Sequence, residues 1–194
     1  MSFKNINVVA NEDIVSDNNP FPVKFTGLDG RYPTSKAFTR PENTTGYTAG
    51  DVIGIADSGT PANAGSAIHK LTSCGPAGGV VRLAELALQI GLTAVTSGMA
   101  NFRVHFYNAN PTAILDNAAF DFVSGDRGKY LGYVDLVTPE DFGSTLWTQG
   151  PVPRDKELQL ASGQTSFWVQ IETRGTYTPA SATAYTLIAD FAAA

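Results

Sequence analysis

The side chains best suited to chemistry in this 194-residue sequence are two histidines and one cysteine. His69 and His105 lie far apart in the sequence, and no nucleophile motif such as G-x-S-x-G accompanies either. Cys74 has no cationic neighbour in the sequence to lower its pKa. A zinc site needs clustered ligands, which these three residues do not supply. We therefore predict solvent-facing strand histidines and an unreactive thiol.

Carboxylates are the second source of chemistry. Two groups are close enough in sequence to be considered as calcium ligands: Glu12, Asp13 and Asp17, and Asp116, Asp121 and Asp126. Neither group has the spacing of an EF-hand loop, and loop residues of this kind form Asx-turns and caps. Glu140 and Asp141 follow Pro139, which predicts a short helical turn with diverging side chains rather than the carboxylate pair of a glycosidase.

Glycines at four-residue intervals are the remaining candidate motif. Gly46, Gly50 and Gly54 lack the Lys-Ser/Thr ending of a phosphate loop, and they predict turns and close approaches of the backbone. With this motif set aside, the sequence predicts no enzyme, no cofactor and no metal ion.

The composition predicts a folded protein with an unusually neutral surface. Hydrophobic residues make up 43% of the chain and charged residues only 16%, against about 25% in a typical domain. A net charge of -5 argues against nucleic-acid binding. The N-terminus lacks the apolar region of a signal peptide, and no apolar run is long enough to span a membrane. We expect a soluble protein, made in a cytoplasm, that packs against other proteins.

The first 45 residues are interrupted by Pro, Gly and Asn, which predicts an irregular N-terminal arm. The arm carries more aromatic residues than a solvated tail would: Phe3, Phe21, Phe25, Tyr32 and Phe38. We expect these side chains to dock on the same domain or on a neighbouring protein. Deletion of residues 1–40 is expected to leave a folded domain that attaches less well to its partner.

Residues 46–194 show short runs of period-two alternation separated by turn residues, which is typical of strands. The predicted strands cover residues 52–56, 66–71, 80–90, 102–107, 130–137, 157–161, 167–171 and 184–191. Eight strands in this length predict an all-β, antiparallel, jelly-roll-like sandwich. One run is ambiguous, because Leu83, Leu86, Ala87 and Ile90 also have helical spacing. We favour a strand there.

Two tryptophans are candidate contact residues. Trp168 turns away from the core if its neighbours Phe167 and Val169 face inward, and Trp147 is predicted to lie in a loop. Tryptophan is enriched at binding hot spots, although a covering segment of the same chain is the simpler explanation for both positions.

A resemblance emerges from a series of phrases in a fixed order. The phrases are residues 47–54, 103–112, 116–120, 129–134, 143–147 and 173–181. Together they resemble a family of small virion proteins of tailed bacteriophages, over about residues 46–191.

The resemblance implies a jelly-roll-like head protein that decorates or cements the outside of the capsid. The implied partners are the major capsid protein and two further copies of the same chain, which would form a homotrimer. The implied location is the virion exterior, after synthesis in the cytoplasm of a bacterial host. A carbohydrate- or receptor-binding module of a tail or head fibre is the alternative, because an exposed Trp147 or Trp168 would also stack on a sugar.

Overall fold

The computed structural model describes residues 30–57, 59–60, 65–153 and 156–194. The chain divides into two compact units between Arg31 and Tyr32, and the fold described here is that of the second unit. Phe3, Phe21 and Phe25, predicted as contact residues, lie outside the described residues. No helix in the described ranges is long and apolar enough to cross a membrane.

Strands dominate the described part of the chain, which has no α-helix and a short 3-10 turn at Ser124–Asp126. The strands are β1 (Arg31–Thr39), β2 (His69–Leu71), β3 (Val80–Ile90), β4 (Phe102–Tyr107), β5 (Tyr130–Leu136), β6 (Glu140–Asp141), β7 (Leu146–Gln149), β8 (Glu157–Gln159), β9 (Phe167–Thr173) and β10 (Ala184–Ala193).

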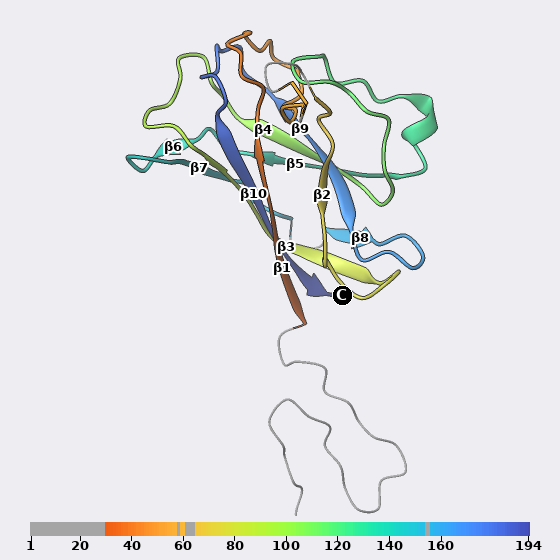
Figure 1. The fold of residues 1–194 in the computed structure, drawn as a ribbon. Helices are drawn as coiled ribbons and strands as arrows, with labels where there is room; N and C mark the ends of the chain where they lie inside the picture. The colour runs from red at the N-terminus through yellow and green to blue at the C-terminus, as the bar shows by residue number, and fades with distance from the viewer. Residues whose placement is uncertain (1–29, 58, 61–64, 154–155) are drawn as a thin grey trace, which may run out of the picture. The chain divides into compact units, whose positions relative to one another are not determined.

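These strands form two sheets (Figure 1). The six-stranded sheet has the order β1-β10-β3-β7-β6, with β8 also pairing with β3, and the four-stranded sheet has the order β2-β9-β4-β5. The pairs of β3 with β10, β7 and β8, and of β9 with β2 and β4, are antiparallel. The predicted all-β antiparallel sandwich is confirmed.

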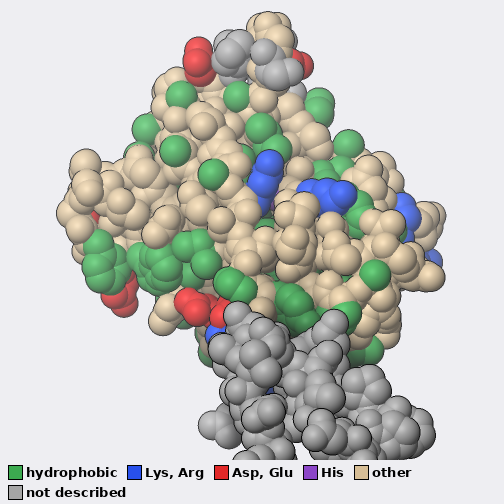
Figure 2. All heavy atoms as spheres, turned by 60° about the horizontal axis from the view of Figure 1, so that its bottom comes forward, with side chains coloured by type: hydrophobic (Ala, Val, Ile, Leu, Met, Phe, Trp, Pro, Cys, Tyr) green, Lys and Arg blue, Asp and Glu red, His purple; other side chains and the backbone are tan. Residues whose placement is uncertain are grey.

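The core lies where the alternating apolar residues of the strands meet. On β4, Phe102, Val104 and Phe106 are fully buried, and Val104 pairs with the buried Ile171 of β9. Each such side chain contributes about 1.5–3 kcal/mol of hydrophobic stabilisation when it is fully buried. The solvent side is sparsely charged, as the composition predicts, and the face drawn in Figure 2 shows charged side chains scattered among neutral ones.

The ambiguous run 80–90 is the strand β3, so the helical alternative is wrong. Its register against β10 shifts so that Asp190 pairs with Glu85 and Phe191 with Leu83, which leaves Ala84 as the extra residue of a β-bulge. The bulge reverses the side-chain alternation. The three-residue spacing between buried Leu83 and Leu86, which imitates a helix, is the consequence.

The predicted irregular arm ends earlier than residue 45, because Arg31–Thr39 forms an edge strand of the six-stranded sheet. Phe38 is buried and Tyr32 packs against the core. Between them, the inward positions hold the partly buried Thr34 and Lys36. Polar residues at these positions hide the strand pattern, so the sequence alone led to a boundary that is too late.

Other boundaries also differ from the prediction. Residues 52–56 form isolated bridges rather than a strand. Glu140 and Asp141, predicted to begin a helical turn, form the short strand β6, and Trp147 lies on β7 rather than in a loop. A two-residue turn at Gly143–Ser144 joins these strands, and the φ of +95° at Gly143 explains the glycine.

Both histidines are buried, which contradicts the prediction that they face solvent. His69 faces the core, where Nε2 donates to the carbonyl oxygen of Ile53 at 3.0 Å and the ring centroid lies 3.9 Å from that of Phe38. This hydrogen bond satisfies one of the two nitrogens of the buried ring, Nε2. Cys74 is buried, and burial raises its pKa to about 11, as expected for an unreactive thiol.

A buried ion pair joins the end of β1 to the loops. The Arg40 guanidinium is 0% exposed, and its Nη2 lies 3.6 Å from Asp116 Oδ2. Asp116 Oδ1 also accepts hydrogen bonds from the Tyr47 hydroxyl at 2.6 Å and the Gly54 amide at 2.7 Å. Asp116 lies in a turn with Asn117, as predicted, but its side chain is buried. A deletion of residues 1–40 would remove β1 and Arg40, so we no longer expect it to leave the domain folded.

Replacement of Asp116 by Asn should destabilise the domain by about 3–5 kcal/mol, because it leaves the buried Arg40 charge without a counter-ion. The free energy of unfolding, measured by urea denaturation, checks this value. Asp121→Asn is the control, since Asp121 is exposed and its replacement should cost less than about 0.5 kcal/mol. Equal stability of the two variants would contradict the role given to the pair.

Stability should fall as the pH drops from about 6.5 to about 4, because burial, with a smaller contribution from Lys36, lowers the pKa of folded His69 to about 4. Above pH 6.5 the ring is neutral in both states and the full stability is present. Below it, the unfolded chain binds a proton that the folded chain excludes, which costs on the order of 3 kcal/mol by pH 4.

Urea unfolding of the wild type and of His69→Gln across this range measures the effect. The wild type should lose more stability than the variant between pH 6.5 and pH 4. Parallel curves for the two proteins would contradict the assignment.

Candidate functional site

The outer face of the four-stranded sheet gathers polar and aromatic side chains. On β4 the outward positions are Arg103, His105 and Tyr107, and on β9 they include Gln170 and Glu172. These outward residues alternate along each strand with the apolar core residues. Because successive side chains of a strand point to opposite faces, burial of the apolar residues places the polar ones on the outer face. The outer face is therefore a consequence of the same pattern that builds the core.

Two loop segments extend this sheet and bring an aromatic ring onto its face. The Ile53 amide donates to the carbonyl oxygen of Ile171 at 2.8 Å, so this segment continues the sheet beside β9. Residues 117–120 pair with it in turn. The Phe120 ring consequently stacks on His105, with the ring centroids 3.8 Å apart and the planes inclined by 10°.

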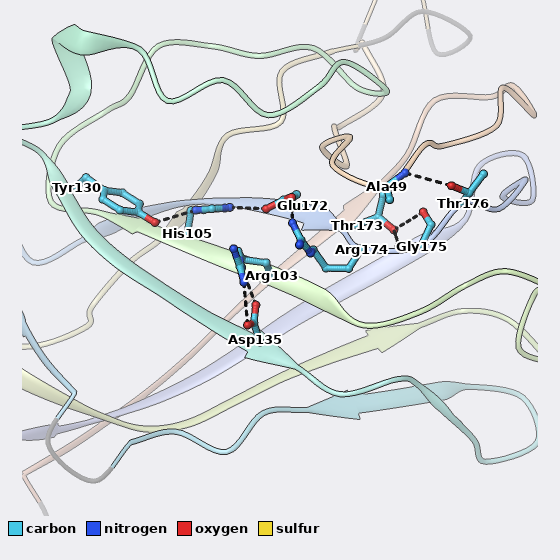
Figure 3. Close-up of polar contacts among 10 residues, drawn as sticks. All are labelled: Ala49, Arg103, His105, Tyr130, Asp135, Glu172, Thr173, Arg174, Gly175 and Thr176. Carbon is cyan, nitrogen blue, oxygen red and sulfur yellow. Dashed lines mark hydrogen bonds and ion pairs between the residues drawn. The ribbon is translucent and has the colours of Figure 1, made fainter.

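A row of hydrogen bonds runs across the face (Figure 3). The Tyr130 hydroxyl lies 3.0 Å from His105 Nδ1, and His105 Nε2 lies 3.0 Å from Glu172 Oε2. The other carboxylate oxygen, Oε1, accepts from Arg174 Nη1 at 2.5 Å. Three side chains from three strands, and Arg174 just after β9, are thereby fixed relative to one another.

Burial and hydrogen bonds shift the pKa values of the residues in this row. Burial lowers the pKa of His105, although the hydrogen bond that its Nε2 donates to Glu172 opposes this shift. Burial raises the pKa of Glu172, but hydrogen bonds from His105 and Arg174 outweigh it and lower the pKa overall. A carboxylate–histidine–hydroxyl row has the order of a hydrolase triad. Here the hydroxyl belongs to Tyr130, whose pKa burial raises to about 12, so the phenol is protonated at neutral pH.

A second ion pair fixes an exposed ring nearby. Arg103 Nε and Nη2 donate to the two carboxylate oxygens of Asp135 at 2.7 and 3.0 Å, a bidentate geometry, and this bond lowers the pKa of Asp135 (Figure 3). The guanidinium carbon lies 3.8 Å from the centroid of the Tyr133 ring, a cation–π contact. Tyr133 is 46% exposed and thus presents a held aromatic ring to the outside.

We call four residues the aromatic face: Phe120, Phe122, Tyr130 and Tyr133. The Phe122 ring lies 4.6 Å from that of Tyr130 and is 38% exposed. Aromatic side chains that are held before binding lose little conformational entropy on association, and such residues make effective hot spots. The arrangement is therefore suited to binding another macromolecule.

The predicted contact residues do not come together at this face. Phe38 is buried against His69 and Tyr185, so it serves the core and not a partner. Tyr32 packs against the same core. Trp168 does face outward, as predicted, with the Lys70 ammonium 5.0 Å from its ring centroid, whereas Trp147 lies on the other sheet.

The aromatic face itself was missed by the sequence analysis. The alternation on residues 102–107 had placed Arg103 and His105 on a polar face, which was the available signal. The ring of Phe120 reaches His105 only through the pairing of distant loops, which no local pattern reveals.

The acidic residues also have structural partners. Asp126 accepts from the Thr112 amide and from Lys129 Nζ, both at 2.8 Å, as expected of a loop cap. Within the described ranges, no group of three or more His, Cys, Asp or Glu residues is placed to hold a metal ion. Glu12, Asp13 and Asp17 lie outside those ranges.

No protein-family model matches this sequence, and no curated protein matches it. The interpretation of the aromatic face rests on its own geometry.

Replacement of Glu172 by Gln should lower the pKa of His105 further, because the carboxylate favours the protonated ring through its hydrogen bond and its charge. An NMR titration of the imidazole protons measures this pKa. Glu140→Gln is the control, since Glu140 is exposed on the other sheet and should leave the titration unchanged. An unchanged His105 pKa in Glu172→Gln would contradict the row as described.

Proposed function

We propose that this chain is a structural virion protein that binds the outside of a tailed-bacteriophage capsid and stabilises it as a decoration, or cement, protein. The resemblance to phage head proteins supplies the class of partner, the major capsid protein. The antiparallel sandwich is compatible with the jelly-roll-like connectivity of this proposal. The chain would act on the exterior of the virion after synthesis in the bacterial cytoplasm.

The observation that carries the proposal is the aromatic face. Its exposed rings, Phe122 and Tyr133, are held by the ring of Tyr130 and by the Arg103–Asp135 pair. His105 and Glu172 on the same face are hydrogen-bonded to each other, and we propose that they hold the face in shape for contact. Rigid aromatic anchors beside an arginine have the composition of a protein-binding hot spot.

The low charge of the chain fits the same role. Attachment to an assembled shell buries surface, and each charged group buried without a partner would oppose it. A protein that binds only the assembled shell stabilises that shell by mass action. In the homotrimer that we propose, three copies of a modest contact would combine by avidity, because the second and third contacts form at a high effective concentration.

The alternative, a carbohydrate- or receptor-binding module of a fibre, is favoured by a different part of the molecule. That part is the surface around Trp147 on the six-stranded sheet. It does not include the aromatic face, so the two functions are separable by mutation.

Replacement of Tyr133 by Ala should weaken attachment to the capsid at least about 30-fold, the effect of losing a hot-spot residue worth about 2 kcal/mol. Capsids lacking the protein are incubated with purified full-length protein, and the copies bound per particle are measured by quantitative mass spectrometry over a range of concentrations. The wild type should saturate at hundreds of copies.

Val95→Ala is the matched control, because Val95 is 38% exposed and lies in the loop before β4. It should bind as the wild type does. Saturation of the wild type at only a few copies per particle would overturn the function. If Tyr133→Ala binds the capsid as tightly as the wild type does, the aromatic face is not the capsid-binding surface.

A further inference from the structure

A hollow of about 420 Å³ lies on the outer face of the six-stranded sheet, beside the β6–β7 hairpin. Gln89, Phe142, Thr145 and Trp147 line it. Figure 2 shows hydrophobic side chains gathered on the flank of the molecule where Figure 1 places β6 and β7. None of these residues belongs to the aromatic face, which lies on the other sheet.

The strand register places two polar side chains beside the Trp147 indole. Trp147 pairs with Gln89 of β3 on one side and with Glu140 of β6 on the other. Residues paired directly across antiparallel strands project from the same face, with their Cβ atoms about 4.5–5.5 Å apart. An amide and a carboxylate therefore flank the indole in one row across three strands.

The Trp147 indole is held in place, and a closed hairpin turn carries the Phe142 ring. Trp147 Nε1 donates to Gln149 Oε1 at 3.3 Å, which fixes the indole. Phe142 is 67% exposed, the most exposed large hydrophobic residue among those described. Its amide donates to the carbonyl oxygen of Thr145 at 2.9 Å, and this bond closes the hairpin turn that carries the ring.

We propose that this hollow is a binding subsite for a neutral sugar ring. One face of a pyranose presents C–H groups that pack on an aromatic ring, while its rim presents hydroxyls that need hydrogen-bond partners. Trp147 and Phe142 supply the apolar surface, and Gln89 supplies both a donor and an acceptor. A few polar groups around an apolar hollow of this size are typical of a small-ligand site.

The charges around the hollow decide which sugars it accepts. Glu140 is exposed on β6 beside Trp147, and an ionised carboxylate accepts hydrogen bonds from hydroxyls. The same carboxylate repels uronic acids, sialic acids and sugar phosphates. The subsite therefore selects neutral saccharides over acidic ones.

The subsite goes beyond the proposed capsid attachment and does not depend on it. If the aromatic face contacts the capsid, the opposite sheet is directed away from the shell, where saccharides of a cell surface are accessible. The residues proposed for sugar binding and for capsid attachment lie on different sheets. A substitution in the hollow is therefore expected to leave capsid attachment unchanged, and a substitution in the aromatic face to leave sugar binding unchanged.

The test measures binding of defined hexasaccharides to the purified full-length protein by saturation-transfer NMR, which detects weak ligands. The neutral probes are maltohexaose and chitohexaose, and the acidic probe is hexagalacturonate. The wild type should bind at least one neutral probe at millimolar concentration and should bind the acidic probe at least about tenfold more weakly.

Trp147→Ala and Phe142→Ala should each reduce affinity for the neutral probe at least about tenfold. Phe142 is largely exposed, so its variant folds normally and keeps the test valid if Trp147→Ala is destabilised. Trp168→Phe is the matched control for the other tryptophan, and it should bind as the wild type does. Tyr133→Ala should also retain sugar binding.

Three results would overturn the subsite. The first is a lack of binding by both neutral probes, and the second is unchanged binding by Phe142→Ala. The third is equal binding of neutral and acidic probes. Loss of capsid attachment by Phe142→Ala without any sugar binding would instead identify the hollow as a protein contact, which also contradicts the proposal.

Discussion

The buried pair of Arg40 and Asp116 is the interaction on which the rest of this structure depends. It joins the end of β1 to two loop segments, because Asp116 also accepts from the Tyr47 hydroxyl and the Gly54 amide. Gly54 is required at this approach, since a Cβ there would lie 2.7 Å from that of Asp116. The segments held in this way continue the four-stranded sheet and bring Phe120 onto His105. The aromatic face thus rests on a polar cluster in the core.

The sequence predicted the fold where alternation is uninterrupted, and it failed where tertiary structure changes the pattern. Residues 102–107 alternate cleanly, and β4 has those bounds. In β3 a bulge at Ala84 shifts the alternation, which explains the helical spacing of its leucines. In β1 the inward Thr34 and Lys36 conceal a strand, so the predicted arm was too long.

The functional surfaces were harder to predict than the strands, for a physical reason. His105 stands at a polar position of β4, yet it is buried because a ring from a distant loop stacks on it. Whether an outward residue is exposed or covered depends on contacts between segments far apart in the sequence. The sequence singled out Trp147 for contact, which stays a prediction, and placed it in a loop instead of on β7.

We propose that the aromatic face binds the capsid and that the hollow around Trp147 binds a neutral sugar. The central claim is the capsid attachment, and a cryo-EM map of the intact virion tests it most directly. The account predicts density for the sandwich on the outside of the shell at many equivalent positions, with the four-stranded sheet toward the capsid protein. A shell without such density, or density confined to the tail, would contradict it.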